Sequence, residues 1–197
     1  MALISSGRRQ HAAVPAQASP TRESADLTAT TPETNSAKAF RYIAAALRLS
    51  LGWIFLWAFL DKLFGLGHET ASKQAWINGG SPTKGFLANA TAGPFADMYH
   101  NIAGDPWADW LFMIGLAGIG LALITGITMR IAAASGVVML VLMWSAVLPP
   151  ENNVFMDDHL IYALALIALA LVKAGNTLGL GGYWERLPLV QRYQALR

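Results

Sequence analysis

Apolar residues fall into four nearly uncharged stretches, and most polar residues lie between them. The stretches cover residues 42–60, 110–129, 131–148 and 160–172. A helix needs about 20 residues to cross a hydrocarbon core about 30 Å thick, so the first three predict membrane-spanning helices. The fourth is shorter, but Lys173 can extend its amino group toward the membrane surface, so we predict a fourth span there. Backbone groups in lipid must be hydrogen-bonded within the segment, so all four are expected to be helical.

Composition points the same way. The chain has 197 residues, of which 54% are apolar and 13% charged, whereas a soluble domain carries roughly a quarter charged residues. These values favour an integral membrane protein with the lipid bilayer as a partner. The absence of cysteine excludes disulfides, thiolate metal sites, Cys-ligated iron–sulfur clusters and covalent haem. A net charge of +2 with scattered basic residues argues against a nucleic-acid partner.

The polar segments divide the chain into three parts. Residues 1–37 are rich in Ala, Ser, Thr and Pro and predict a disordered N-terminal tail. Residues 38–182 predict an all-α, four-helix transmembrane bundle with a long extracytoplasmic loop between its first two helices. Residues 183–197 form a C-terminal tail. Ten of the 14 Lys and Arg lie on one side of the predicted spans, and the positive-inside rule then places both termini in the cytoplasm of a multi-pass cell-membrane protein.

Small residues spaced four apart predict where the helices approach closely. The pairs are Gly118 with Ala122, Ala122 with Gly126, and Ala132 with Gly136. Small side chains at this spacing let membrane helices pack closely. In stretches so rich in Gly and Ala, such pairs also arise by chance.

Arg48 is the one charge well inside a predicted span. Such a charge is costly in lipid and often marks a functional site. One interpretation is that Arg48 binds a quinone headgroup or another anionic or carbonyl-bearing ligand, with Trp57 and Trp144 as further quinone or lipid contacts. The alternative is that Arg48 reaches lipid phosphate or caps helix carbonyls, and that the tryptophans belong to an interfacial belt.

A second group of candidates lies at the outer ends of the spans. Asp61 and Lys62 close the first stretch, and Asp158 and His159 open the fourth. They predict an outward-facing polar pocket that binds substrate, and the alternative is a set of solvated helix caps. His68, His100 and His159 all fall on this side. None of them shares a metal-ligand spacing with another on one element, so no metal is expected.

Several of these residues recur in a known pattern. The chain resembles the DoxX/DoxD-like membrane proteins in three places: Arg48, Gly52 and Asp61-Lys62 in the first span, the loop run at residues 75–83, and the opening Asp157-Asp158-His159 of the fourth span. The resemblance covers roughly residues 40–182. The loop run and the acidic-His opening are similar to the DoxD branch.

The resemblance implies a four-helix membrane bundle in respiratory redox chemistry. DoxD is the larger subunit of a thiosulfate:quinone oxidoreductase, which oxidises thiosulfate to tetrathionate and passes electrons to quinone. It therefore implies an oxidoreductase subunit with quinone as a diffusible electron acceptor. The sequence holds no motif for a bound cofactor, so a second redox subunit or a homo-oligomer is expected as partner.

Three functional hypotheses follow, none of which assigns a catalytic residue. The first is a redox subunit that couples thiosulfate or a related donor to quinone, with Lys62 and His159 at the donor site. The second is a non-catalytic membrane scaffold that recruits a redox enzyme through the long loop. The third is a small-solute transporter, suggested by Arg48 but disfavoured by the absence of an evident inverted repeat.

Overall fold

The computed structural model describes residues 34–196, which are helical or irregular and contain no strand. Its four long helices are α1 (Asn35–Phe64), α4 (Pro106–Thr125), α5 (Met129–Ala146) and α6 (Asp158–Leu171). By length and composition, α1, α4 and α5 can each cross a membrane. Helix α6 is apolar but has only 14 residues. The prediction of an all-α membrane protein is confirmed, with three candidate spans.

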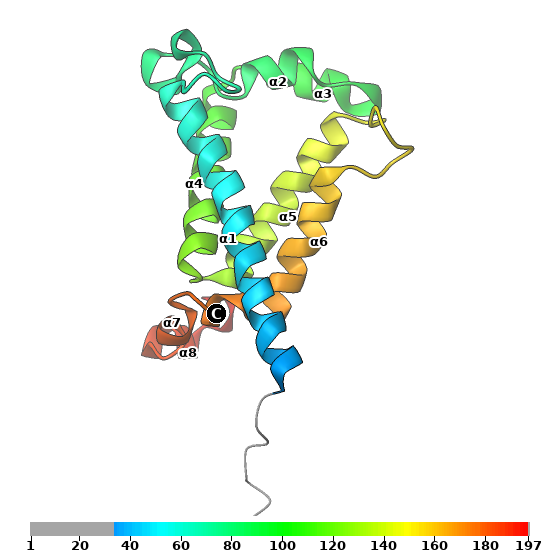
Figure 1. Ribbon diagram of the computed structural model, residues 1–197. Helices are drawn as coiled ribbons and strands as arrows, with labels where there is room; N and C mark the ends of the chain where they lie inside the picture. The colour runs from blue at the N-terminus through cyan, green and yellow to red at the C-terminus, as the bar shows by residue number, and fades with distance from the viewer. Residues whose placement is uncertain (1–33, 197) are drawn as a thin grey trace, which may run out of the picture. The chain divides into compact units, whose positions relative to one another are not determined.

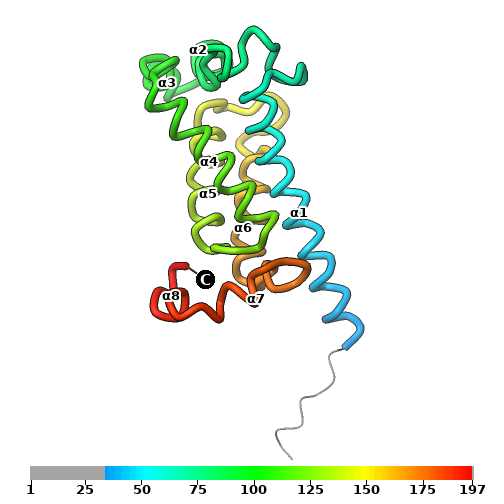
Figure 2. The backbone as a smooth tube through the Cα atoms, turned by 90° about the vertical axis from the view of Figure 1, so that its left-hand side faces the viewer, coloured from blue at the N-terminus to red at the C-terminus, as the bar shows by residue number. Residues whose placement is uncertain are grey.

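The long helices pack mainly as two neighbouring pairs (Figures 1 and 2). Helix α1 lies along α4, α5 lies along α6, and α4 and α5 also pack against each other. Buried apolar side chains from all four helices form one core cluster, including Phe55, Met113, Leu140 and Leu166. The α4–α5 connection is very short because Gly126 ends α4 in the left-handed conformation, at φ 77°.

Glycines set the distance between α1 and α4. A Cβ atom added to Gly120 would lie 2.8 Å from the backbone nitrogen of Leu56, and one added to Gly52 would lie 2.9 Å from Ile124. The two backbones therefore approach more closely than a methyl group permits. By contrast, Gly118, a member of one of the predicted close pairs, has no neighbour within 4 Å of such an atom.

The segment between α1 and α4 is folded. It contains η3 (Ser72–Gln74), η4 (Trp76–Asn78), α2 (Lys84–Asn89), η5 (Gly93–Phe95) and α3 (Ala96–Asn101). Leu87 of α2 and Tyr99 of α3 are buried together with Ala146 at the end of α5. The Tyr99 hydroxyl also donates to the Leu142 carbonyl at 3.0 Å. We call this end of the helices the loop end (top of Figure 1).

The opposite end, the tail end, carries the C-terminal residues (Figure 1). Here η6 (Ala174–Asn176) is followed by α7 (Gly181–Trp184), α8 (Pro188–Arg192) and η7 (Gln194–Leu196). Val190 is fully buried, and the Trp184 indole donates to the Leu196 carbonyl at 2.6 Å. The predicted C-terminal tail at residues 183–197 is therefore structured as far as residue 196.

The predicted N-terminal tail at residues 1–37 lies mostly outside the described residues, which begin at residue 34. Helix α1 begins at Asn35, so the last three residues of the predicted tail are helical.

Candidate functional site

Arg48 lies at the tail end and joins three parts of the chain. Its side chain is fully buried. Nη1 donates to the Leu123 carbonyl and, at 3.0 Å, to that of Ile124, both in the last turn of α4. Nη2 donates to the carbonyls of Thr177 and Leu178, after α6, at 3.4 and 2.9 Å. The final carbonyls of a helix lack helical partners, so Arg48 caps α4 and fastens the C-terminal segment to it.

Glycines make room for this guanidinium. Cβ atoms on Gly126 and Gly179 would lie 3.0 and 3.1 Å from its terminal nitrogens. Nε is the one buried side-chain nitrogen or oxygen without a hydrogen-bond partner within residues 34–196. The observed arrangement is thus the helix-capping alternative that the sequence left open. A quinone contact by Arg48 stays a prediction.

Asp61 and Lys62, at the loop end of α1, have different environments. The Asp61 side chain is buried, and its carboxylate accepts from the backbone nitrogens of His68 and Glu69 at 3.3 and 3.0 Å. It therefore fixes the chain as it leaves α1. Lys62 is half-buried, and no ion pair or hydrogen bond engages its amino group in the described part of the chain. Of the two, Lys62 has the charge left for a ligand.

A second buried carboxylate anchors the loop and was not among the predicted site residues. Oδ1 of Asp109, in the first turn of α4, accepts from the Ser81 hydroxyl at 2.8 Å and from the Thr83 nitrogen and hydroxyl at 3.0 and 2.6 Å. Gly80, just before these residues, packs so closely on the backbone of Gln74 and Ala75 that a side chain there would clash. The Gly-Ser-Pro-Thr run at residues 80–83, which is part of the loop run similar to the DoxD branch, is therefore a turn that attaches the loop segment to the start of α4. An acidic residue in the first turn of an apolar helix was the available signal for Asp109.

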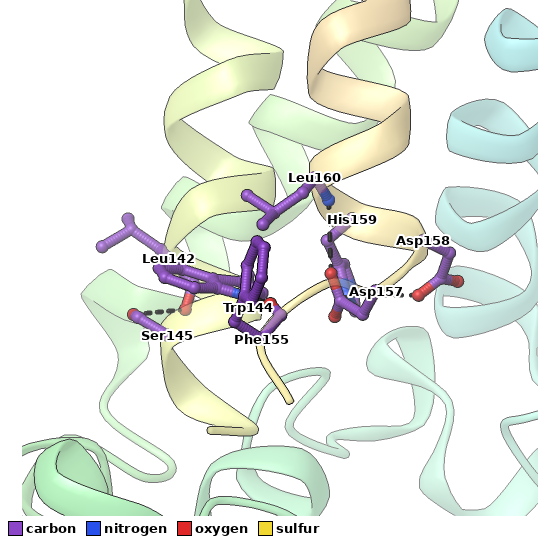
Figure 3. Close-up of polar contacts among 8 residues, drawn as sticks. All are labelled: Leu142, Trp144, Ser145, Phe155, Asp157, Asp158, His159 and Leu160. Atoms are coloured by element: carbon purple, nitrogen blue, oxygen red, sulfur yellow. Dashed lines mark hydrogen bonds and ion pairs between the residues drawn. The ribbon is translucent and has the colours of Figure 1, made fainter. Parts of the chain in front are cut away.

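Asp157 and His159 form a contact at the start of α6 (Figure 3). The Asp157 side chain caps the helix, with Oδ1 accepting from the Leu160 nitrogen at 3.2 Å. Its Oδ2 lies 2.7 Å from Nδ1 of His159, and an Asp158 oxygen lies 3.5 Å from the same nitrogen. A carboxylate at Nδ1 favours the tautomer with its proton there, which leaves Nε2 to accept or deliver a proton.

Ligand atoms of Asp157, Asp158 and His159 all lie within 4.8 Å of one another, a spacing that can hold a metal ion. Both Asp157 oxygens already accept hydrogen bonds or contact the imidazole, and Asp158 is exposed. Apart from this spacing, no feature of Asp157, Asp158 and His159 favours a metal ion.

The two predicted tryptophans lie at the loop end. The Trp144 indole donates to the Phe155 carbonyl at 2.7 Å, next to the Asp157–His159 contact (Figure 3). Trp57 packs edge-on against His68, with ring centroids 5.2 Å apart. Trp57 is nine residues beyond Arg48 on α1, a rise of about 14 Å. The three predicted quinone or lipid residues are thus not in one place.

The four predicted substrate-binding residues fall into two clusters. Asp61 and Lys62 close α1, whereas Asp158 and His159 open α6, and the two helix ends lie apart in Figure 1. Within residues 34–196, no hydrogen bond or ion pair joins one cluster to the other. A single substrate pocket formed by all four residues is not observed.

Comparison with known proteins identifies a family. A family model described as DoxX matches residues 43–148, which is more than half of the chain. The matched range contains Arg48, Asp61, Lys62 and Asp109, and it ends before α6. No curated protein and no solved structure gives a significant match.

Proposed function

This chain belongs to the DoxX family of membrane proteins, a family linked to membrane redox and stress roles, and from that premise we propose that it is the membrane subunit of a respiratory redox system. The proposed reaction is oxidation of thiosulfate, or a related donor, coupled to reduction of quinone. The proposed specificity follows the DoxD-like loop run and the acidic-His opening of α6. A second redox subunit completes the electron path, because the chain has no motif for a bound cofactor.

The observation that carries the proposal is the Asp157–His159 contact. Quinone reduction consumes two electrons and two protons for each quinone. An imidazole held by a carboxylate at 2.7 Å through Nδ1 keeps a fixed orientation and can deliver a proton from Nε2. His159 is partly buried, with 19% of its side chain exposed, so it can contact both water and a ligand at the membrane surface.

The donor side requires a cation, because thiosulfate carries two negative charges. Two thiosulfate ions lose one electron each and form the central S–S bond of tetrathionate, and the two electrons reduce one quinone. Lys62 is half-buried and has no carboxylate partner in the described residues, so its charge is available for such an anion. We place the donor at Lys62 and the proton delivery at His159, as two separate functions of the loop end.

The proposed topology has four spans, with the loop end outside the cell and both termini in the cytoplasm. Helix α6 rises about 21 Å over its 14 residues, less than a full hydrocarbon core. Lys173, two residues beyond the end of α6, is exposed, and its long side chain reaches the membrane surface from within.

The test uses membranes that contain the chain together with its co-expressed redox partner. Thiosulfate-dependent quinone reduction is expected. His159→Gln should lower kcat about 100-fold, the lower range of general acid–base contributions, whereas His100→Gln, on an exposed residue of α3, should leave kcat unchanged. Lys62→Ala should raise KM for thiosulfate, and Lys84→Ala is its exposed control. Absence of any thiosulfate-dependent quinone reduction with the partner present would refute the proposal.

A second function is favoured by the folded loop segment. Two buried carboxylates, Asp61 and Asp109, fix this segment to the long helices, and Ile77, Phe95 and Met98 present exposed apolar side chains on it. A rigid surface with exposed apolar residues suits a non-catalytic scaffold that binds a redox enzyme. In that case the triple variant Ile77→Ser/Phe95→Ser/Met98→Ser should lose the partner, whereas His159→Gln should retain both partner and activity.

A further inference from the structure

A groove of about 350 Å³ lies between α5 and α6 at the tail end. Alanines make it hollow, because Ala133 and Ala134 on α5 face Ala170 on α6. Ile167 and Leu171 of α6 also line it, and they are 42% and 77% exposed. In a membrane, an apolar groove on the side of two helices faces the acyl chains of lipids.

Two cations lie at one end of this groove. Arg130 is in the first turn of α5, and Lys173 lies two residues beyond the end of α6. Arg130 donates through Nη1 to the Gln194 carbonyl at 3.0 Å, and its other N–H groups have no partner among residues 34–196. Lys173 lies 3.2 Å from Glu185 in an exposed ion pair, and such pairs are weak. The two cations against one carboxylate leave a net positive charge at this end.

A small hollow with a mixed polar and apolar lining adjoins the cations. It measures about 20 Å³ and is lined by Arg130, Lys173, Asn176 and Glu185, among others, which is room for about one water molecule. The groove and the hollow share the two cations Arg130 and Lys173, together with Ala170. A phospholipid likewise joins an apolar acyl chain to a negatively charged phosphate.

We propose that this groove binds one anionic phospholipid, with the phosphate at Arg130 and Lys173 and an acyl chain between α5 and α6. Basic pockets between membrane helices bind acidic lipid headgroups in this way. The net positive charge at the groove selects an anionic lipid over a zwitterionic one, and the groove selects a lipid over a free phosphate ion. The site involves none of the residues assigned to redox chemistry.

The test is lipid titration of the purified full chain in detergent, followed by native mass spectrometry. Phosphatidylglycerol should form a one-to-one complex at concentrations where phosphatidylcholine does not. The double variant Arg130→Gln/Lys173→Gln should bind phosphatidylglycerol about 30-fold more weakly, since each basic residue near an acidic lipid contributes roughly a factor of five. The matched control Arg186→Gln/Arg192→Gln removes the same charge from exposed residues of the C-terminal segment and should bind as the parent chain does.

A second variant tests the contribution of the groove to lipid binding separately from that of the two charges. Ala134→Phe fills the groove from an exposed position on α5 without changing the charge. It should retain the parent melting temperature and lose phosphatidylglycerol binding. Four results would each overturn the proposal. They are equal binding of phosphatidylglycerol and phosphatidylcholine, undiminished binding of phosphatidylglycerol by the double variant or by Ala134→Phe, competition by inorganic phosphate, and a second copy of the chain in place of lipid.

Discussion

At the scale of single residues, the least expected role is that of Arg48. An arginine inside an apolar helix usually draws attention as a ligand-binding group. Here its two terminal nitrogens donate to four backbone carbonyls, two from the last turn of α4 and two from the segment after α6. A planar guanidinium with several fixed donors can serve two segments at once, whereas an ammonium group is a compact point charge.

This geometry predicts a stability defect for a substitution that retains the charge. In Arg48→Lys the ammonium cannot reach both pairs of carbonyls, so buried acceptors lose their donors. We expect the free energy of unfolding to fall by about 3 kcal/mol, the range for a broken buried polar network. The measurement is thermal unfolding in detergent by circular dichroism. Arg192→Lys, at an exposed position, is the control. An unchanged melting temperature for Arg48→Lys would contradict the proposal that Arg48 stabilises the fold by joining α4 to the C-terminal segment.

The sequence predicted some of these residue roles better than others. The sequence placed Asp157-Asp158-His159 at the opening of the fourth span, and Asp157 is the cap of α6. The pairing of Asp157 with His159 follows from closeness in sequence. Asp109 was missed as an anchor because its partners, Ser81 and Thr83, lie 26 to 28 residues away. Long-range contacts of this kind depend on how the segment folds back, which local spacing does not reveal.

At the scale of helices, glycines control how closely α1 and α4 pack. The sequence predicted small-residue pairs on α4 and α5, but the α1–α4 contact uses Gly52 and Gly120. Of the predicted pairs, Gly136 does face α6, where Leu166 occupies the space that a side chain would need. Helices that are apolar on every side give little indication of which face meets a neighbour, so spacing alone could not choose between the glycines of α4.

Two glycines on the same helix provide a matched test. Gly120→Ala places a methyl group 2.8 Å from the Leu56 nitrogen and must displace α1, whereas Gly118→Ala extends into open space. Both substitutions gain the same helix propensity, so the difference between the stabilities of the two variants measures the effect of helix packing alone. We expect Gly120→Ala to be about 2 kcal/mol less stable than Gly118→Ala. The two melting temperatures in one detergent measure this difference, and equal values would exclude the close α1–α4 contact.

At the scale of the whole molecule, the hydropathy pattern predicted the long helices but not the structure of the segments between and after them. The apolar stretches predicted the four long helices closely, because hydrophobic length is a strong signal. They did not reveal that the segments expected as a loop and a C-terminal tail carry short helices and buried residues such as Tyr99 and Val190. Short helices in polar sequence depend on tertiary packing, which a hydropathy pattern does not contain.

The absence of cysteine makes the sidedness directly measurable. Asn152→Cys and Ala195→Cys place single thiols at exposed positions on either side of α6. A membrane-impermeant maleimide applied to intact cells should label position 152 and leave position 195 unlabelled, because the proposed topology puts residue 152 outside. Both should react after detergent treatment, which is the control for thiol reactivity. Labelling of both positions in intact cells, or of neither, would show that α6 does not cross.

The Arg48 contacts also impose an order on biosynthesis. Arg48 is made 75 residues before Leu123 and 130 residues before Leu178. At a synthesis rate of about 5–20 residues per second, its last acceptor follows it by on the order of ten seconds. During that interval the first helix carries a charge without its final partners, so the insertion machinery or lipid headgroups must hold it until the end of the chain arrives. Completion of the C-terminal segment is therefore the step that closes the tail end of this protein. A ribosome that stops before residue 177 leaves Arg48 with only the carbonyls of α4 as acceptors.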